Sequence, residues 1–288
     1  MSGFHTPVLL QSVCTLLNVQ PGRKYVDATL GGGGHTAAIV ELGGRVLGLD
    51  QDPDAIAACR SAEAFQPALA SAQADPQLVL VRANFIHLSK VVQQHSWQPL
   101  WGILLDLGVS LHQLVTPQRG FSFQSVGPLD MRMDPDLPNS AATLVNVLTV
   151  KQLEQLFREY GEEPAATAVA RRIVSARPLA TTDELARILT DAHQRRRVFQ
   201  SLRIAVNDEL AALSAVLPQA FDLLHPGGRL VIISFHSLED RIVKNQFSAW
   251  IRSGRAVSLT DPPVTPGPEE ISANPHAQSA KLRSIEKI

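Results

Sequence analysis

Residues 27–35 read DATLGGGGH, and the four consecutive glycines separate a short apolar run from a segment with a helical pattern. Glycine adds nothing to a hydrophobic core and loses more conformational freedom on folding than any other residue. Four in a row are therefore expected where something must approach the backbone closely. A glycine-rich turn that opens a helix presents backbone N–H groups to an anionic group. The stretch predicts a ligand-binding turn, and the alternative is a tight turn without a ligand.

Short apolar runs rich in Val, Ile and Leu recur along the chain. They are Lys24–Asp27, Arg45–Asp50, Leu78–Val81, Trp101–Asp106 and Arg229–Phe235. Each is too short for a helix and is typical of a buried parallel strand. Helical patterns cover Thr36–Leu42 and Pro53–Ala70 between them, and this alternation predicts an α/β protein with a doubly wound sheet. Lys281–Ile288 alternates in polarity and predicts a last, antiparallel strand.

The gap between Asp106 and Arg229 is far longer than the roughly 10–12 residues that a crossover needs. Helical periodicity within it covers Lys151–Arg158, Ala165–Ser175, Thr182–His193 and Arg203–Leu217. Thr181 and Glu184 have the spacing of a capping box. We expect one domain over 1–110 and 205–288, a helical subdomain inserted over 111–204, and a helix from about 205 returning to the sheet. The proline-rich stretch 257–275 predicts a long irregular loop.

Composition excludes several classes of protein. Hydrophobic residues make up 45% and charged residues 18%, as in ordinary globular domains. The net charge of -1 does not indicate a nucleic-acid partner. Cys14 and Cys59 lack the spacing of a disulfide framework or a zinc site, which fits a reducing cytosol and predicts no metal. With no long apolar stretch and no secretory signal at the N-terminus, we expect a cytoplasmic protein without a membrane span.

The glycine turn follows the first predicted strand, where open α/β sheets bind ligands. A phosphate-binding P-loop requires Lys after the glycines, whereas His35 and Thr36 stand there. The dinucleotide pattern Gly-x-Gly-x-x-Gly is met at Gly31 and Gly33 but has Thr36 at its third position. NAD therefore remains an alternative on the residues alone.

S-adenosylmethionine is the third ligand that the turn could accept. Its carboxylate suits backbone amides at a helix N-terminus. Asp27 could take its ammonium group, and Asp50, at the end of the second predicted strand, suits a ribose diol. The same acid would serve NAD equally well.

Eight motifs, which follow one another along the chain, narrow the choice of ligand. They are HTPVLL at 5–10, DATLGGGGH at 27–35, GLDQDPDAI at 48–56, ILLDLGVS at 103–110, RGFSF at 119–123, GPLDMRMD at 127–134, RIAVNDEL at 203–210 and PGGRLVIISFHSLEDRIVK at 226–244. The series resembles the bacterial small-subunit ribosomal RNA cytosine-N4 methyltransferase family, called RsmH or MraW. The resemblance covers about residues 4 to 250 and is looser over 150–200.

The resemblance implies a class I (Rossmann-like) S-adenosylmethionine-dependent methyltransferase fold with an inserted helical subdomain for substrate recognition. It implies transfer of a methyl group to the exocyclic N4 of a specific cytidine in the decoding region of 16S rRNA. The partner is then 16S rRNA, within the assembled small ribosomal subunit, and no membrane is involved. The sequence leaves open whether the protein is a monomer or a homodimer.

Cofactor contacts carried over from the family are Gly33, Gly34, His35, Asp50, Phe85, Asp106 and Gln113. Gln113 stands in SLHQL, where the family more often has Ser-Ser-Pro before the Gln, but it keeps its spacing from Asp106. Each position also has a plainer interpretation: Asp50 as a helix cap, Phe85 as core packing and His35 as a solvent-facing first-turn residue.

The loop after the fourth predicted strand is where related amino-methyltransferases hold the target amine. We hypothesise that Asp106, or a backbone carbonyl of this loop, accepts hydrogen bonds from the cytosine N4 amine. Phe121 and Phe123 could stack on the extruded base, or pack in a core. The six arginines at 171, 172, 195, 196, 197 and 203 could bind phosphates, or belong to a solvated helix face.

Two readings of other classes remain. SFHSLED at 234–240 contains Ser, His and Asp, but no Gly-x-Ser-x-Gly elbow frames Ser234, which argues against a hydrolase. A non-catalytic RNA-binding assembly factor that keeps the cofactor site is the main rival. The intact DATLGGGGH and DLGVS motifs count against it.

Overall fold

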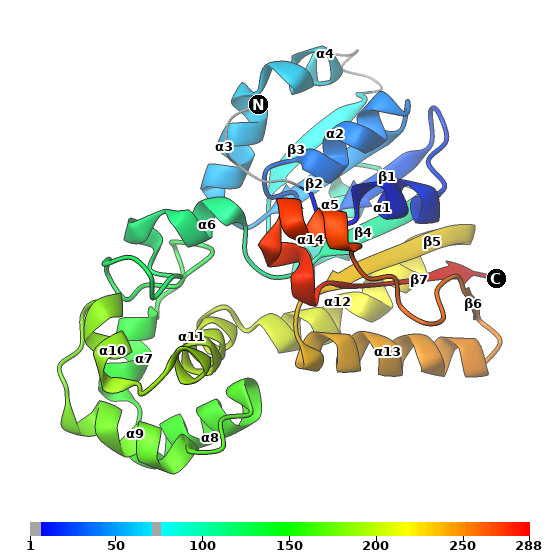
Figure 1. The fold of residues 1–288 in the computed structure, drawn as a ribbon. Coiled ribbons are helices and arrows are strands. Elements are labelled where there is room, and N and C mark those ends of the chain that lie inside the picture. Colours follow the sequence, from blue (N-terminus) through cyan, green and yellow to red (C-terminus); the bar gives the residue numbers. More distant parts are fainter. Residues whose placement is uncertain (1–6, 71–75) are drawn as a thin grey trace. The chain divides into compact units, whose positions relative to one another are not determined.

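The computed structural model describes residues 7–70 and 76–288, which form two compact units. The sheet unit comprises the described residues up to Gly108 together with Ala211–Ile288, and the insert comprises Val109–Leu210. Figure 1 labels the elements of both. His5 and Thr6 of the HTPVLL motif lie outside the described residues. In the part of the chain that is described, no helix has the length and apolarity to cross a membrane.

The sheet unit contains all seven strands found in the described chain. They are β1 (Lys24–Asp27), β2 (Arg45–Asp50), β3 (Leu78–Arg82), β4 (Leu100–Asp106), β5 (Leu224–Ser234), β6 (Ala256–Ser258) and β7 (Lys281–Lys287), in the order β3-β2-β1-β4-β5-β7-β6. The first five are parallel, and β7 pairs antiparallel with β5 and β6. The predicted α/β class and the antiparallel last strand are therefore confirmed. The unpredicted β6 forms one edge.

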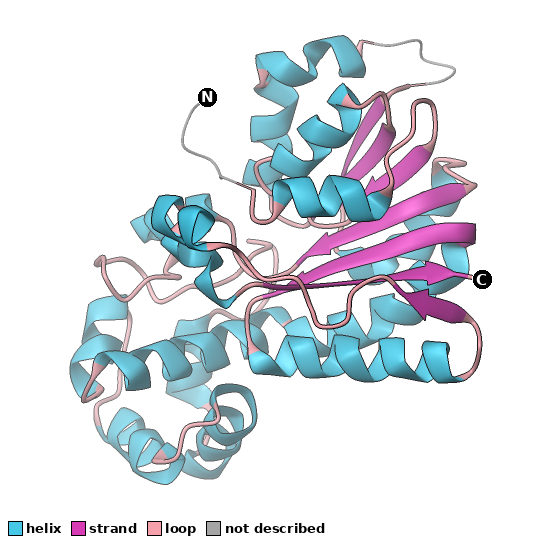
Figure 2. Ribbon diagram, turned by 45° about the vertical axis from the view of Figure 1, so that its right-hand side comes forward, coloured by secondary structure: helices cyan, strands magenta, loops and turns pink. Residues whose placement is uncertain are grey.

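Helices cover both faces of the sheet (Figure 2). The helices of the sheet unit are α1 (Leu10–Leu17), α2 (Gly34–Glu41), α3 (Pro53–Ser61), α4 (Gln66–Leu69), α5 (Leu88–Gln94), α12 (Glu209–Leu223), α13 (Ser237–Arg252) and α14 (Pro268–Ala273), with 3-10 turns η1 (Glu63–Phe65), η2 (Phe85–His87) and η4 (Pro275–Ser279). Alternate strand residues point to opposite faces. Ile103 and Leu105 join the core under α5, α12 and α13, whereas Leu104 joins the core under α1, α2 and α3. The sheet is thus buried on both sides, as its nearly continuous apolar strands predict.

Two predictions in the sheet unit are wrong in detail. The helix expected over Pro53–Ala70 ends at Ser61, because Ala62 is extended with φ -71° and ψ 126°, and it resumes as η1 and α4. The loop expected over 257–275 is not irregular throughout. It contains α14 and the start of η4, and Val264 bridges to Leu282 of β7.

The insert is helical. It contains α6 (Leu111–Val115), η3 (Pro117–Arg119), α7 (Ala141–Val147), α8 (Val150–Gly161), α9 (Ala166–Ser175), α10 (Thr182–Ile188) and α11 (Ala192–Asn207) around a core of its own. The helices α8 and α9 cover the predicted segments. The capping box at the start of α10 is confirmed, since Thr181 Oγ1 accepts from the Glu184 N–H and Glu184 Oε2 accepts from the Thr181 N–H.

The two later helix predictions in the insert are wrong. The helix expected over Thr182–His193 ends at Ile188, because Asp191 caps a new helix by accepting from the Gln194 N–H at 2.9 Å. The helix expected over Arg203–Leu217 is broken by Asp208, whose φ of 50° is left-handed. The expected boundary at 204 therefore falls inside α11, and the insert as a compact unit ends at Leu210.

Two of the family motifs meet inside the insert. The buried Asn207, in RIAVNDEL, accepts from the Met133 N–H at 2.7 Å and donates to the Met131 carbonyl at 2.8 Å. Asp130 and Arg132 form an ion pair at 2.7 Å within GPLDMRMD. The structure thus gives both motifs a role in shaping the insert.

Candidate active site

Three acids end three neighbouring strands of the sheet. Asp50 ends β2, Asp27 ends β1 and Asp106 ends β4, and these strands lie side by side in the order β2-β1-β4. Because the strands are parallel, their carboxyl ends lie on one edge of the sheet, where ligands bind in open α/β folds. In this sequence, an apolar run that ends in an acid therefore places that acid at the ligand-binding edge of the sheet.

The glycine turn is attached to this row of acids. The Gly31 N–H donates to Asp50 Oδ2 at 2.8 Å, with Gly31 at φ 50°. Gly33 has φ 76° and precedes α2. A Cβ on Gly33 would lie 2.7 Å from the Phe65 ring and 2.9 Å from Cys59 Sγ. Only glycine fits there, both for its backbone conformation and because α3 and η1 pack directly beneath the turn.

Gly34, also a predicted cofactor contact, is the first residue of α2. A Cβ on Gly34 would lie 2.9 Å from the Pro7 side chain. The backbone amides that open α2 belong to Gly34, His35 and Thr36, and a helix N-terminus favours an anionic group.

Asp27 is buried and Asp50 is half-buried, and both carboxyl groups are bonded to neutral donors. Thr36 Oγ1 donates to Asp27 Oδ2 at 2.7 Å, and the Asp52 N–H donates to Asp50 Oδ1 at 2.8 Å. Burial raises the pKa of each carboxyl to about 6, although these hydrogen bonds oppose the shift. A cation placed among them would favour their ionised form.

Asp106 lies near three other titratable groups, those of His35, Asp27 and Glu239. Its backbone N–H donates to Thr29 Oγ1 at 2.6 Å, and its Oδ2 lies 3.7 Å from His35 Nδ1. Burial raises the pKa of Asp106 well above its ordinary value, and the nearby Asp27 and Glu239 add to the shift. This carboxyl is therefore a better proton acceptor than an ordinary aspartate.

The side chain of His35 is buried, with 5% of the residue exposed, so the solvent-facing interpretation is wrong. Its Nε2 lies 3.0 Å from the Val8 carbonyl oxygen. Burial lowers the pKa of His35 to about 4, against smaller opposing effects of Val8 and Glu270. The ring is therefore neutral at neutral pH.

Phe85 lies three residues beyond the end of β3, next to the end of β2. The Ala83 N–H donates to the Asp50 carbonyl at 2.8 Å, and Asn84 Nδ2 donates to Gln51 Oε1 at 2.8 Å. The half-buried Phe85 packs against the core under α5. This placement suits the predicted adenine contact and the packing interpretation alike.

Gln113 belongs to the insert, where it makes a capping box. Its Oε1 accepts from the Ser110 N–H at 3.0 Å, and its own N–H donates to Ser110 Oγ at 3.2 Å. Its side chain therefore helps to start α6. The cofactor contact expected of Gln113 stays a prediction.

Sequence reasoning missed Glu239, which is 2% exposed and lies in the first turn of α13. Its Oε2 accepts from the Phe235 N–H at 2.8 Å, and its Oε1 lies 3.1 Å from His236 Nε2. The three-residue spacing of His236 and Glu239 is the signal that could have found this pair. Asp240 forms an ion pair with Arg283 at 2.7 Å, so the structure does not support the hydrolase alternative.

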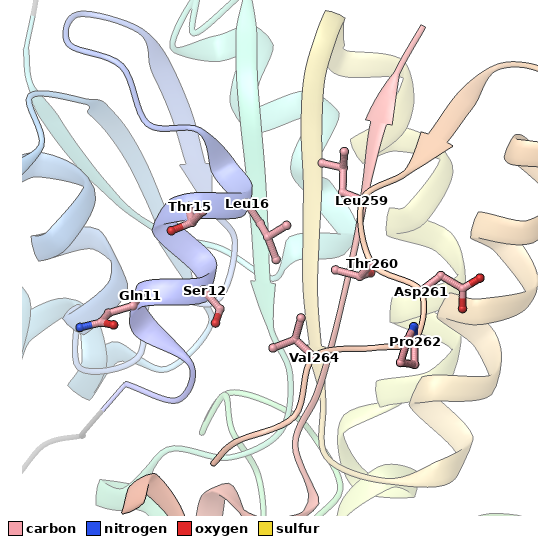
Figure 3. A pocket seen from close by; sticks show the side chains of 9 residues that line it. All are labelled: Gln11, Ser12, Thr15, Leu16, Leu259, Thr260, Asp261, Pro262 and Val264. Atoms are coloured by element: carbon pink, nitrogen blue, oxygen red, sulfur yellow. The ribbon is translucent and has the colours of Figure 1, made fainter.

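A hollow of about 520 Å³ lies elsewhere in the sheet unit, between α1 and the segment after β6 (Figure 3). Gln11, Ser12, Thr15, Leu16, Leu259, Thr260, Asp261, Pro262 and Val264 line it. None of the predicted site residues is among them. Within the described ranges 7–70 and 76–288, no cluster of His, Cys, Asp and Glu could hold a metal ion.

Comparison with known proteins agrees with the motifs. Residues 2–288 match the MraW methylase family. The ribosomal RNA small subunit methyltransferase H of Thermomicrobium roseum is 44% identical over 317 residues, covering 100% of this chain and 95% of that protein. The protein of the same name from Heliobacterium mobile is 44% identical over 321 residues and 100% of both chains.

Solved structures are more distant. An rRNA methylase from Streptococcus thermophilus superposes with a TM-score of 0.46 at 12% identity over 99% of each chain. The family match over nearly the whole sequence is decisive, together with the glycine turn and the row of acids. The chain belongs to the MraW methylase family of S-adenosylmethionine-dependent methyltransferases.

Proposed function

We propose that the protein methylates the exocyclic N4 of a specific cytidine in the decoding region of 16S rRNA. The observation that carries the proposal is the buried Asp106 at the end of β4, whose raised pKa suits a proton acceptor. The names of the two relatives, which act on small-subunit ribosomal RNA, support the substrate class.

The residues of the site fit S-adenosylmethionine, which supplies an electrophilic methyl group on a sulfonium. Asp50 would hold the ribose hydroxyls, and Asp27 would hold the ammonium group. The amides that open α2, over Gly34 and His35, would bind the carboxylate. The raised pKa values of these two acids are the feature that fits, because a cationic ligand close to them favours their ionised form.

Asp106 would activate the nucleophile, which is the N4 amine of the cytosine. The lone pair of the cytosine amine is delocalised into the ring, so the amine is a poor nucleophile until a group accepts its hydrogens. Asp106 would accept a hydrogen bond from N4–H and take the proton as the N4–methyl bond forms. Proton acceptance of this kind typically contributes about 10²–10⁴-fold to the rate, and alignment of the reacting atoms contributes a further share.

The insert would recognise the RNA, and its side chains set limits on how. Phe121 is 7% exposed in the core of the insert, which favours packing over base stacking. The half-buried Phe123 stands edge-on to Phe199 at 5.4 Å. Among the six arginines, only Arg171 and Arg196 are exposed. We propose that these two, rather than the whole set, contact phosphate groups.

The decisive experiment uses tritiated S-adenosylmethionine and small ribosomal subunits from a strain that lacks its own enzyme. After the reaction the RNA is digested and the labelled nucleoside is identified. We expect label in N4-methylcytidine, with assembled subunits a better substrate than naked 16S rRNA. The Asp106→Asn variant serves as the control for contaminating activity.

A different labelled nucleoside would reject the N4 assignment while leaving methyl transfer intact. Cofactor binding without transfer to subunits or to naked RNA would favour the assembly factor instead. The cytoplasmic location is a separate prediction, which fractionation of cells can check, and light scattering can decide between a monomer and a homodimer.

A further inference from the structure

The segment before α1, from the HTPVLL motif, has no part in the function proposed above. Val8 and Leu9 are nevertheless buried, at 1% and 5% exposure. Leu9 has left-handed backbone angles, φ 53° and ψ 34°, which are unusual for a bulky side chain. Such strain persists only where the surroundings hold it.

The group that holds this turn comes from the far end of the sequence. Glu270 Oε1, on α14, accepts a hydrogen bond from the Leu9 N–H at 2.6 Å. Figure 1 shows α14, in orange-red, beside the blue α1. The strained turn of the HTPVLL motif is thereby tied to the segment that follows β6.

The same turn presents the Val8 carbonyl to the ring of His35. Since a carbonyl only accepts hydrogen bonds, His35 Nε2, at 3.0 Å, must carry the ring proton. A neutral imidazole has one N–H, so Nδ1 carries a lone pair. That atom lies 3.7 Å from Asp106 Oδ2. The chain of contacts therefore runs from Glu270 through Leu9, Val8 and His35 to Asp106.

We infer that Glu270 is a positioning residue for methyl transfer, because it fixes the turn that selects the Nε2–H tautomer of His35 beside Asp106. The inference rests on the proposed function, in which Asp106 takes the proton. As the N4–methyl bond forms and the sulfur–methyl bond breaks, that proton moves from N4 to the Asp106 carboxyl. A lone pair on His35 Nδ1 favours the protonated carboxyl. The other tautomer would point an N–H at Asp106 and favour the ionised form, which weakens the base.

Two substitutions separate this role from general stability. Glu270→Ala removes the acceptor, whereas Glu270→Gln keeps an oxygen that can accept from the Leu9 N–H. We expect Glu270→Ala to lower kcat about tenfold with the KM for S-adenosylmethionine changed less than about twofold, and Glu270→Gln to recover most of the rate. Glu269→Ala, at the exposed neighbouring position of α14, is the matched control and should behave as wild type.

The tautomer of His35 gives a readout that needs no RNA. Nitrogen-15 NMR of the imidazole distinguishes a protonated Nε2 from a protonated Nδ1, and the signals that vanish in His35→Gln assign the ring. We expect only the Nε2–H form in the wild type and in Glu270→Gln. Glu270→Ala should show a mixture of both tautomers.

A wild-type kcat in Glu270→Ala would overturn the inference. So would a lower kcat with the tautomer unchanged, because the contact would then serve stability alone. If the wild type makes no N4-methylcytidine, the proposed function fails by itself, and the NMR result still decides whether Glu270 controls the tautomer.

Discussion

The two units bury acids in opposite ways. In the sheet unit, Asp27 and Asp50 take hydrogen bonds from neutral hydroxyl and backbone donors, and burial raises the pKa of each to about 6. In the insert, burial would raise the pKa of Glu163 too. However, Arg197 Nε at 2.6 Å and the Gln194 amide at 3.2 Å bring that pKa below its ordinary value.

This difference distinguishes acids that would bind a ligand from acids that stabilise the fold. Glu163 has its charge matched within the insert, so it contributes to stability as it stands. Asp27 and Asp50 are costly to ionise in the protein alone, and a cationic ligand removes that cost. Acids with raised pKa values at strand ends therefore indicate the ligand-binding site. The buried acid of the insert, whose pKa is lowered, does not.

The largest expected effect concerns Asp106. Asp106→Ala should lower kcat at least about 1,000-fold, equivalent to about 4 kcal/mol in the barrier, because no other group then accepts the N4 proton. The affinity for S-adenosylmethionine, measured by calorimetry, should change much less. A wild-type kcat in this variant would reject Asp106 as the acceptor.

Removing an acid from the row should weaken the cofactor. Asp50→Asn should raise the Kd for S-adenosylmethionine about 30-fold, near 2 kcal/mol, because hydrogen bonds to a charged acceptor are lost. Asp54→Asn, at the exposed first turn of α3, is the control and should leave the Kd unchanged. Equal Kd values for the two variants would mean that Asp50 only caps the adjoining turns.

The converse experiment tests the insert. Glu163→Gln should lower the free energy of unfolding by about 2 kcal/mol, because Arg197 loses its charged partner. The Kd for S-adenosylmethionine should stay at the wild-type value. Thermal unfolding and calorimetry measure the two quantities, and a weakened cofactor with unchanged stability would contradict the distinction between the units.

The pH dependence of cofactor binding should follow the raised pKa values. Asp27 and Asp50 are ionised above about pH 6 and protonated below it. Binding the cationic ammonium group at lower pH requires the proton on Asp27 to leave, so affinity should fall about tenfold from pH 7 to pH 5 through this group, with a proton released on binding. Calorimetry in buffers of different ionisation enthalpy detects the release. Affinity that is flat over this range would refute the assignment.

The smallest effect belongs to the exposed arginines. Replacing Arg171 and Arg196 with Gln should weaken RNA binding roughly three- to tenfold at low salt and reduce the salt slope by about 1–2. Arg172→Gln should instead lower stability, because this side chain bonds to the Ile188 carbonyl at 3.0 Å and to Gln194 at 2.9 Å. If replacing Arg171 and Arg196 leaves RNA binding unchanged, these two side chains do not contact phosphate groups.

The sequence alone determined the α/β class, the positions of the five parallel strands and the acids that close three of them. Apolar periodicity and strand length are local properties, and parallel pairing places strand ends together without further information. The series of eight motifs pointed to the family. Local chemistry likewise predicted the capping box of Thr181 and Glu184, since both partners lie within one helical turn.

Only the tertiary structure decided which partners the polar side chains found. Nothing near His35 in sequence indicates that its ring meets Val8 and Asp106, or that Phe65 and Cys59 pack under Gly33. The breaks at Ala62 and Asp208 were missed because helical periodicity continues across them. The contacts of His35 and Gly33 join segments that are distant in the sequence, which burial selects and which local patterns do not encode.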